Sequence, residues 1–253
     1  YKKAWVFLFP FLFFSCSQSP KSTTQVEQTK ASDEEVHNPE STAEKCELAL
    51  LTLFESWPTE TELDNEHIAD AADLWLKIIQ SAQESLDFSE FYAVNSPNSK
   101  LDTIIQAIKD AGNRGVKIRF IVDKSMLKDD NVALVKEIEN WPNTQLRIID
   151  YNAISGGVQH AKYFIVDNKV AFFGSQNFDW RSLEHISEMG VLIRQQQLVQ
   201  IYAETFQIDW LRANDPKAEI TKSSHKMPIT LDYKGEESSL FVMGFTSDFK
   251  THR

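Results

Sequence analysis

The stretch at residues 159–191 restricts the fold more than any other part of this sequence. Residues 161–166 and 170–173 are apolar runs with the composition of β-strands, and Asp-Asn-Lys at 167–169 separates them. Asp and Asn favour tight turns, so the pattern predicts a strand, a turn and a returning strand. A hairpin of this kind brings the residues before its first strand close to those after its second.

Polar residues gather at the open end of this predicted hairpin. His160 and Lys162 are two positions apart at the start of the first strand, so their side chains share a face. The returning strand delivers Gly174 and Ser175 to the same end. Asn177 follows, and a short helix expected to begin near residue 178 would point its backbone N–H groups at the same place.

An imidazole, an ammonium and an amide that meet at one point are suited to a phosphate group. Lysine supplies a full charge and three donors, and the amide and backbone N–H groups supply further donors. Lys162 is expected to bind a non-bridging phosphate oxygen and to stabilise charge that grows in the transition state. The imidazole of His160 can then attack phosphorus or transfer a proton.

These residues, written H-x-K-x4-D-x6-G-S-x-N, resemble the HKD motif of the phospholipase D superfamily. The resemblance implies a histidine nucleophile, a covalent phosphohistidine intermediate and a second histidine that acts first as acid and then as base. It also implies that no metal and no cofactor takes part. Three segments are similar to the branch of animal endolysosomal single-strand exonucleases and poxvirus envelope phospholipase-like proteins: EFYAVNS at 90–96, RGVKIRFIVDKS at 114–125 and GSQNFDWRSLEH at 174–185.

The resemblance also assigns roles to the remaining motif residues. Asp167 belongs to the family's catalytic motif, although a turn residue explains it equally well. Asn177 is expected to contact phosphate or to cap the short helix, and these roles are compatible. Gly174 and Ser175 are assigned to phosphate binding.

A carboxylate partner for the nucleophile is expected at Glu188, which opens the strand after the hairpin. The family places there a carboxylate that hydrogen-bonds the imidazole, which would fix its tautomer. Glu184 is the rival and is interpreted as a surface charge. Phe178 and Trp180 could stack a base or line a lipid pocket, with core packing as the simpler interpretation.

Helix and strand patterns alternate through most of the chain, which indicates an α/β sandwich with a largely parallel central sheet, as in phospholipase D-like domains. Residues 47–54 fit a strand or a helix. Helices are expected at 67–84, at 101–111 ending at Gly112, at 131–140 and at 196–213, and strands at 85–94, 116–123, 145–150 and 188–194.

The first 45 residues carry the signs of export and tethering. Residues 1–16 combine two lysines, a short apolar run and Ser-Cys, which resembles a signal peptide with a lipobox in which Cys16 is lipidated. Residues 17–45 lack apolar periodicity and indicate a disordered tether, followed by the phospholipase D-like domain at 46–253. We therefore expect a membrane-anchored lipoprotein of the bacterial cell envelope.

The sequence contains a single H-x-K motif, whereas the two-step mechanism needs a second histidine on the opposite side of phosphorus. A second half in a missing C-terminal region is the favoured source, and a homodimer is the alternative. The expected substrate is phospholipid or single-stranded nucleic acid. The net charge of −11 disfavours an extended surface for polyanions but allows a local positive pocket. A non-enzymatic phosphate- or membrane-binding protein on the same fold is the other hypothesis.

Overall fold

The computed structural model describes residues 50–128, 131–220, 225, 229–233 and 236–240. The predicted signal peptide, Cys16 and the tether at 17–45 lie outside these residues. The strands are β1 (Leu51–Ser56), β2 (Ala69–Asp70), β3 (Ser85–Glu90), β4 (Ala93–Val94), β5 (Lys117–Asp123), β6 (Thr144–Ile149), β7 (Lys162–Val166), β8 (Val170–Gly174), β9 (Phe178–Asp179), β10 (Glu188–Ile193), β11 (Ile229–Tyr233) and β12 (Glu236–Leu240). The helices are α2 (Ala71–Ser81), α3 (Lys100–Asn113), the 3-10 helix η1 (Lys124–Met126), α4 (Asn131–Ile138), α5 (Tyr151–Ser155), α6 (Trp180–Glu184) and α7 (Gln196–Asn214).

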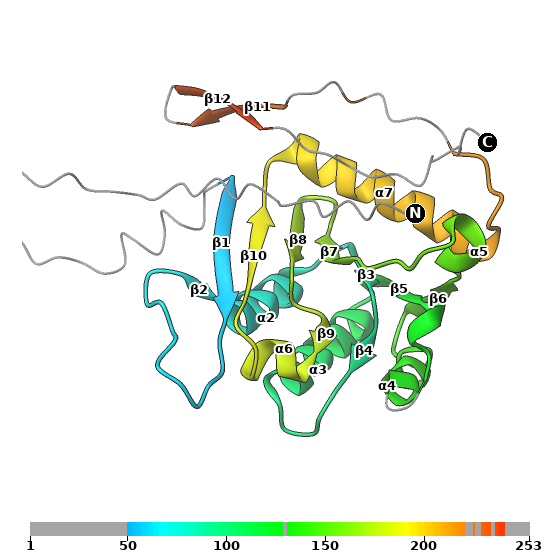
Figure 1. Cartoon of the computed structure of the whole chain (residues 1–253), viewed down its shortest axis with the longest axis horizontal. Helices are drawn as coiled ribbons and strands as arrows, with labels where there is room; N and C mark the ends of the chain where they lie inside the picture. Colours follow the sequence, from blue (N-terminus) through cyan, green and yellow to red (C-terminus); the bar gives the residue numbers. More distant parts are fainter. Residues whose placement is uncertain (1–49, 129–130, 221–224, 226–228, 234–235, 241–253) are drawn as a thin grey trace, which may run out of the picture. The chain divides into compact units, whose positions relative to one another are not determined.

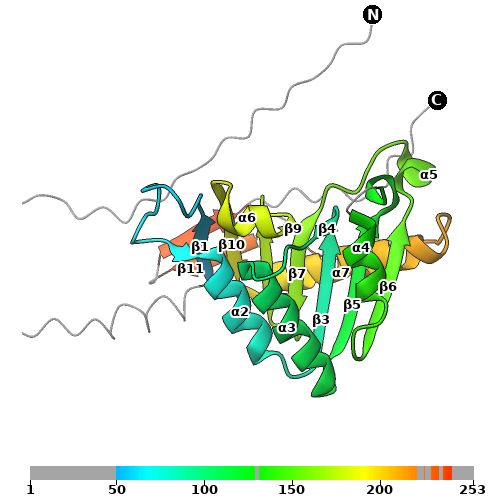
Figure 2. The same cartoon turned by 90° about the horizontal axis from the view of Figure 1, so that it is seen from below.

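Within the described residues, eight strands form one central sheet in the order β2-β1-β10-β8-β7-β3-β5-β6. Helices α2, α3 and α4 cover one face of this sheet and α7 crosses the other (Figures 1 and 2). Two apolar cores separate the three layers. The larger core packs aromatic residues such as Trp75, Phe88 and Phe164 under α2 and α3, and the smaller one packs Phe206 and Trp210 of α7 against the sheet.

The α/β fold class is confirmed, but the sheet is mixed. β3, β5 and β6 run parallel, because the chain crosses back over the sheet through α3 and α4 between them. β7 and β8 form the predicted hairpin, and the pairings β3–β7, β7–β8, β8–β10 and β10–β1 are antiparallel. The expectation of a largely parallel sheet therefore holds for its β3–β5–β6 side and for the short β1–β2 pair at the other edge, but not for its centre.

Local signals set most helix ends, and one expectation was wrong. α2 begins after Asp70, whose carboxylate accepts from the N–H groups of Ala72 and Asp73 at 2.6 and 3.1 Å. α3 does not end at Gly112 but continues to Asn113, and the chain turns at Gly115 with a φ of +97°. Gly112 instead gives close packing, since a Cβ there would lie 2.1 Å from the carbonyl oxygen of Pro142.

Candidate active site

The candidate active site lies at one end of the central strands, where β3 ends and β7 begins. His160 is exposed just before β7, and Lys162 is the buried first residue of that strand. Lys162 Nζ lies 3.3 Å from His160 Nε2 and donates to the His160 carbonyl oxygen at 3.3 Å. The predicted pairing of imidazole and ammonium is therefore present.

This contact decides the tautomer of the neutral imidazole. An ammonium has only donors, so Nε2 must be the acceptor and the ring proton is on Nδ1. Partial burial against its neighbours, followed by the charge of Lys162, lowers the pKa of the otherwise exposed His160. The imidazole is therefore neutral at neutral pH, with the Nε2 lone pair beside the ammonium.

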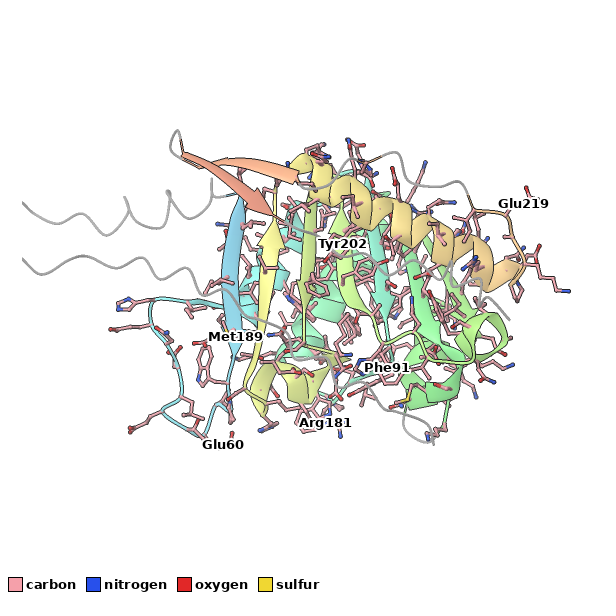
Figure 3. All side chains as sticks on the ribbon, turned by 45° about the horizontal axis from the view of Figure 1, so that its top comes forward. Glu60, Phe91, Arg181, Met189, Tyr202 and Glu219 are labelled. Atoms are coloured by element: carbon pink, nitrogen blue, oxygen red, sulfur yellow. The ribbon has the colours of Figure 1, made fainter. Side chains whose placement is uncertain are left out.

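Aromatic contacts hold the imidazole in place. The Phe91 ring packs edge-on against His160 with their centroids 4.6 Å apart, and Lys162 Nζ lies 5.4 Å from the centroid of the same ring. Phe91 follows β3 directly, and Figure 3 shows it at the same edge of the molecule as Arg181 of α6. The His160 end of β7 is therefore packed on one side and open on the other.

Glu188 acts on this pair through its charge, and Asn177 contacts the nearby Ser182. Glu188, at the start of β10, interacts electrostatically with Lys162, and Ser182 favours its charged form. Burial raises the pKa of Glu188 to about 7, although Ser182 and Lys162 oppose this rise. The Asn177 backbone N–H donates to Ser182 Oγ at 3.2 Å, and the buried Asn177 Oδ1 has no hydrogen-bond partner. Charge therefore couples Glu188 to the His160–Lys162 pair, and Asn177 is connected to Glu188 through Ser182.

Two details differ from the expectations for these residues. Glu188 forms no hydrogen bond with His160 in the described structure, and its Oε2 is buried without a partner. The short helix begins at Trp180, and its N-cap is Asp179, which accepts from the Arg181 N–H at 2.9 Å. Asp179 takes the cap because the chain is still extended at β9, so Asn177 is not the cap.

Gly174 and Ser175 line the return from β8. Gly174 pairs with Gly190 of β10, and a Cβ on Gly174 would lie 2.4 Å from Gln176 Oε1. Ser175 is exposed and its hydroxyl lies 3.3 Å from both the N–H and the carbonyl oxygen of Met189. These residues therefore fix the path of the chain between β8 and β10, and their predicted contact with phosphate remains a prediction.

Asp167 lies away from this group, at the opposite end of β7. Five residues separate it from Lys162, which along a strand is about 16 Å. Its carboxylate accepts from the backbone N–H groups of Gln83, Glu84 and Ser85, the closest at 2.7 Å. Of the two roles considered, this position is that of a turn residue that ties the hairpin to the start of β3.

The neighbouring side chains have structural partners. Glu184 Oε1 accepts from the Lys100 N–H at 2.6 Å, so this carboxylate supports the start of α3 and is more than a surface charge. Phe178 is fully buried in the larger core, and Trp180 packs against the edge of that core.

Sequence reasoning missed Glu90, the last residue of β3, which is fully buried and is the strand partner of Lys162. The alternation of side chains along the strand could have revealed its burial, because it places Glu90 on the same face as the apolar Leu86 and Phe88.

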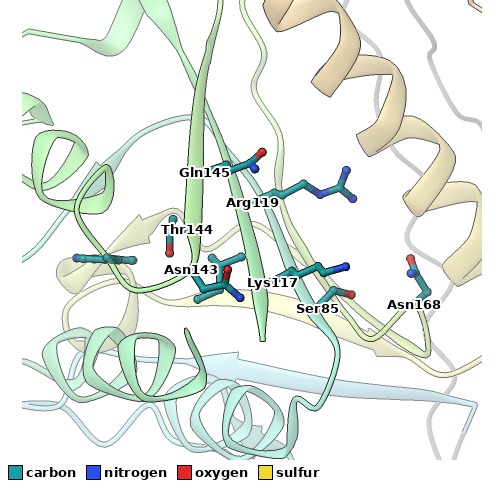
Figure 4. A pocket seen from close by; sticks show the side chains of 9 residues that line it. Ser85, Lys117, Arg119, Asn143, Thr144, Gln145 and Asn168 are labelled. Carbon is teal, nitrogen blue, oxygen red and sulfur yellow. The ribbon is translucent and has the colours of Figure 1, made fainter. Parts of the chain in front are cut away.

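Two other features of the described residues bear on chemistry. A hollow of about 480 Å³ lies at the opposite ends of the strands from His160, beside Lys117, Arg119 and Asn168 (Figure 4). In the part of the chain that the structure describes, no group of three or more His, Cys, Asp or Glu side chains is placed to hold a metal ion.

Several known proteins are similar to this chain. The family described as "Cardiolipin synthase, PLD-like domain" matches residues 75–210. The virion nicking-joining enzyme of Vaccinia virus (strain Western Reserve) is 31% identical over 179 residues, which are 68% of this chain and 39% of that protein. Phospholipase D Y of Dictyostelium discoideum is 29% identical, with 61% of this chain and 37% of that protein covered. The 5'-3' exonuclease PLD3 of Bos taurus is 28% identical, with 58% and 31% covered. The chain thus spans less than half the length of these relatives.

Solved structures show the same fold. NucT from Helicobacter pylori is similar with a TM-score of 0.52 and 22% identity, covering 64% of this chain and 95% of that chain. Nuc from Salmonella typhimurium, a phospholipase D family member, has a TM-score of 0.51 and 25% identity, covering 64% and 93%.

Proposed function

The chain belongs to the phospholipase D-like family, and from this premise we propose that it cleaves phosphodiesters through a covalent phosphohistidine at His160, without a metal ion. The observation that carries the proposal is the 3.3 Å contact between Lys162 Nζ and His160 Nε2. A phosphate oxygen bound by that ammonium brings phosphorus next to the Nε2 lone pair.

The reaction then has two balanced steps. In the first, Nε2 of His160 forms a bond to phosphorus and the bond to the leaving oxygen breaks, while an acid on the opposite side protonates that oxygen. In the second, water attacks phosphorus, the bond from phosphorus to Nε2 breaks, and the same group accepts the proton of the water. Lys162 and the Asn177 side chain bind the non-bridging oxygens, where charge accumulates.

The acid is the part of the mechanism that this H-x-K motif does not supply. We infer that a second motif faces His160, either from a second copy of the chain or from a further part of the same protein. Mixing the wild type with the inactive His160→Ala variant separates these sources. Turnover that falls below the share of wild-type chains supports two copies that share a site, and turnover proportional to that share supports a second motif within one chain.

The substrate class follows from the surroundings of the site. A hollow of about 560 Å³ lies beside Asn95, Lys128, Asn131, Trp180 and Arg181, where α6 begins. Cations, amides and an indole suit the phosphates and bases of single-stranded nucleic acid better than acyl chains. We therefore propose single-stranded nucleic acid as the substrate, with phospholipid as the other outcome of the test.

The test uses the purified full-length protein, including the source of the second motif, with EDTA, a labelled oligonucleotide and vesicles of phosphatidylcholine. Turnover of the oligonucleotide together with an acid-labile phosphate label on the protein supports the proposal, provided that His160→Ala loses both. His67→Ala is the matched control, because His67 is an exposed histidine outside the site. Turnover of the vesicles alone would redirect the assignment to phospholipid, and full activity of His160→Ala would refute the mechanism.

Export and anchoring through Cys16 are a separate proposal, supported by the apolar run and Ser-Cys of the sequence. In the described part of the chain, no helix combines the length and apolar character that a membrane span requires. Labelled palmitate incorporated into the wild-type chain and not into Cys16→Ser would support lipidation. Equal labelling of both would contradict it.

A further inference from the structure

Glu90 is a buried carboxyl that the proposed mechanism does not use. It is 0% exposed, and neither of its carboxyl oxygens has a hydrogen-bond partner. Buried polar groups nearly always have such a partner, so this exception requires an explanation. Its Cα partner across the antiparallel β3–β7 pairing is Lys162.

The surroundings of Glu90 favour its uncharged form. Leu86 and Phe88 share its face of β3, and its partner on the other side, Val122 of β5, is also apolar. The charged group that acts on it is Lys162, which in turn is flanked by Glu188 from β10. Burial raises the pKa of Glu90 well above its usual value, and the charge of Lys162 only partly opposes this.

The direction of the Lys162 side chain agrees with a neutral neighbour. Its ammonium hydrogen-bonds Nε2 and the carbonyl oxygen of His160, along its own strand, and does not bond to the Glu90 carboxyl across the strand pair. A buried carboxylate at that place would attract the ammonium strongly, because opposite charges interact far more in a dry interior than in water.

We propose that Glu90 is a positioning residue for Lys162, and that its uncharged carboxyl leaves the ammonium beside His160 to bind the phosphate of the substrate. The proposal rests on the proposed function in one respect, that the ligand of Lys162 is a phosphate. When Glu90 loses its proton, the carboxylate pairs with Lys162 and competes with that ligand.

The first experiment measures protonation and needs no catalytic activity. Urea unfolding is followed from pH 4 to pH 8 in the wild type, Glu90→Gln and the control Glu84→Gln, whose side chain is 70% exposed. The unfolded chain ionises Glu90 above a pH of about 4.3 while the folded chain keeps the proton. The wild type should therefore lose stability relative to Glu90→Gln as pH rises, by up to about tenfold in the unfolding equilibrium constant per pH unit. A gap that does not change with pH would overturn the proposal.

The second experiment measures the effect on Lys162 by titrating inorganic phosphate calorimetrically from pH 7 to pH 10. Glu90→Gln should bind within about twofold of the wild type at pH 7. As pH rises, its affinity should fall less than that of the wild type, up to the pH at which Lys162, whose pKa is lowered by burial, loses its own proton. Coincident pH profiles, or a loss of about tenfold or more in Glu90→Gln already at pH 7, which corresponds to about 1.4 kcal/mol, would overturn it.

Oligonucleotide kinetics then separate positioning from catalysis. In the wild type KM should rise at alkaline pH with kcat nearly unchanged, and in Glu90→Gln this rise should move to higher pH. A fall in kcat without a change in KM would contradict a positioning role. If the stability and phosphate results hold and no oligonucleotide or vesicle is cleaved, the proposed function fails and the inference about Glu90 stands.

Discussion

Replacing Asp167 tests whether this motif residue acts in catalysis or in folding. Its carboxylate accepts three backbone N–H groups from residues 83–85, and its φ is 53°, in the left-handed region. At about 1 kcal/mol for each partly exposed hydrogen bond, Asp167→Ala loses about 3 kcal/mol. The left-handed backbone adds about 1 kcal/mol for an alanine. We therefore expect a total loss of about 4 kcal/mol.

Asn168→Ala is the matched control. Asn168 has a φ of 51° in the same turn, and its exposed side chain forms none of these three bonds. It should lose only the backbone contribution of about 1 kcal/mol, so the difference between the two variants measures the hydrogen bonds.

The assay is urea unfolding at pH 7, with kcat/KM measured at a temperature where all variants are folded. We expect unchanged kcat/KM in Asp167→Ala, because the residue lies at the far end of β7 from His160. A large fall in kcat/KM with unchanged stability would refute this reasoning.

The same variant has a defined pH dependence. Burial raises the pKa of Asp167, but the hydrogen bonds from Ser85, Glu84 and Gln83 outweigh it, so the folded-state pKa is lowered. The stability that the carboxylate provides is therefore present above the usual pKa of about 3.9 and is lost as pH falls through the folded value. The gap between wild type and Asp167→Ala should shrink over that range. A gap that stays constant down to pH 2 would contradict the proposed hydrogen bonding.

Three further predictions concern the site and the packing around it. His160→Ala should lower kcat at least about thousandfold without changing the urea midpoint, because the side chain is exposed; retained turnover would exclude it as the nucleophile. Glu188, with a pKa of about 7 when folded, should make the wild type less stable relative to Glu188→Gln as pH rises from about 4.3 towards 7. Equal urea midpoint differences at pH 4.5 and pH 8 would contradict that assignment. Gly112→Ala should cost about 2 kcal/mol, because its Cβ would overlap the Pro142 carbonyl, whereas Gly157→Ala meets only a contact at 3.8 Å and should cost much less. Similar urea midpoints for the two variants would show that this overlap relaxes freely.

The elements that the sequence predicted correctly depend on local chemistry. The β7–β8 hairpin follows from two apolar runs around Asp167 and Asn168, whose side chains tolerate the left-handed backbone of a tight turn. The contact between His160 and Lys162 follows from the two-residue repeat of a strand, which holds in any sheet. Local patterns are therefore enough to predict the fold class and the central pair of the candidate site.

The features that local patterns could not predict depend on contacts between residues far apart in the chain. Strand direction was unpredictable because β10 pairs with β1, more than 130 residues earlier, and no local pattern encodes that pairing. Gly112 looked like a helix end because its close neighbour, Pro142, lies 30 residues further on. Glu90 shares the apolar face of its strand, and only the pairing of β3 with β7 places it beside Lys162. Removal from water disfavours the charged form of a carboxyl, and Glu90 is removed from water only when the strands of the sheet assemble.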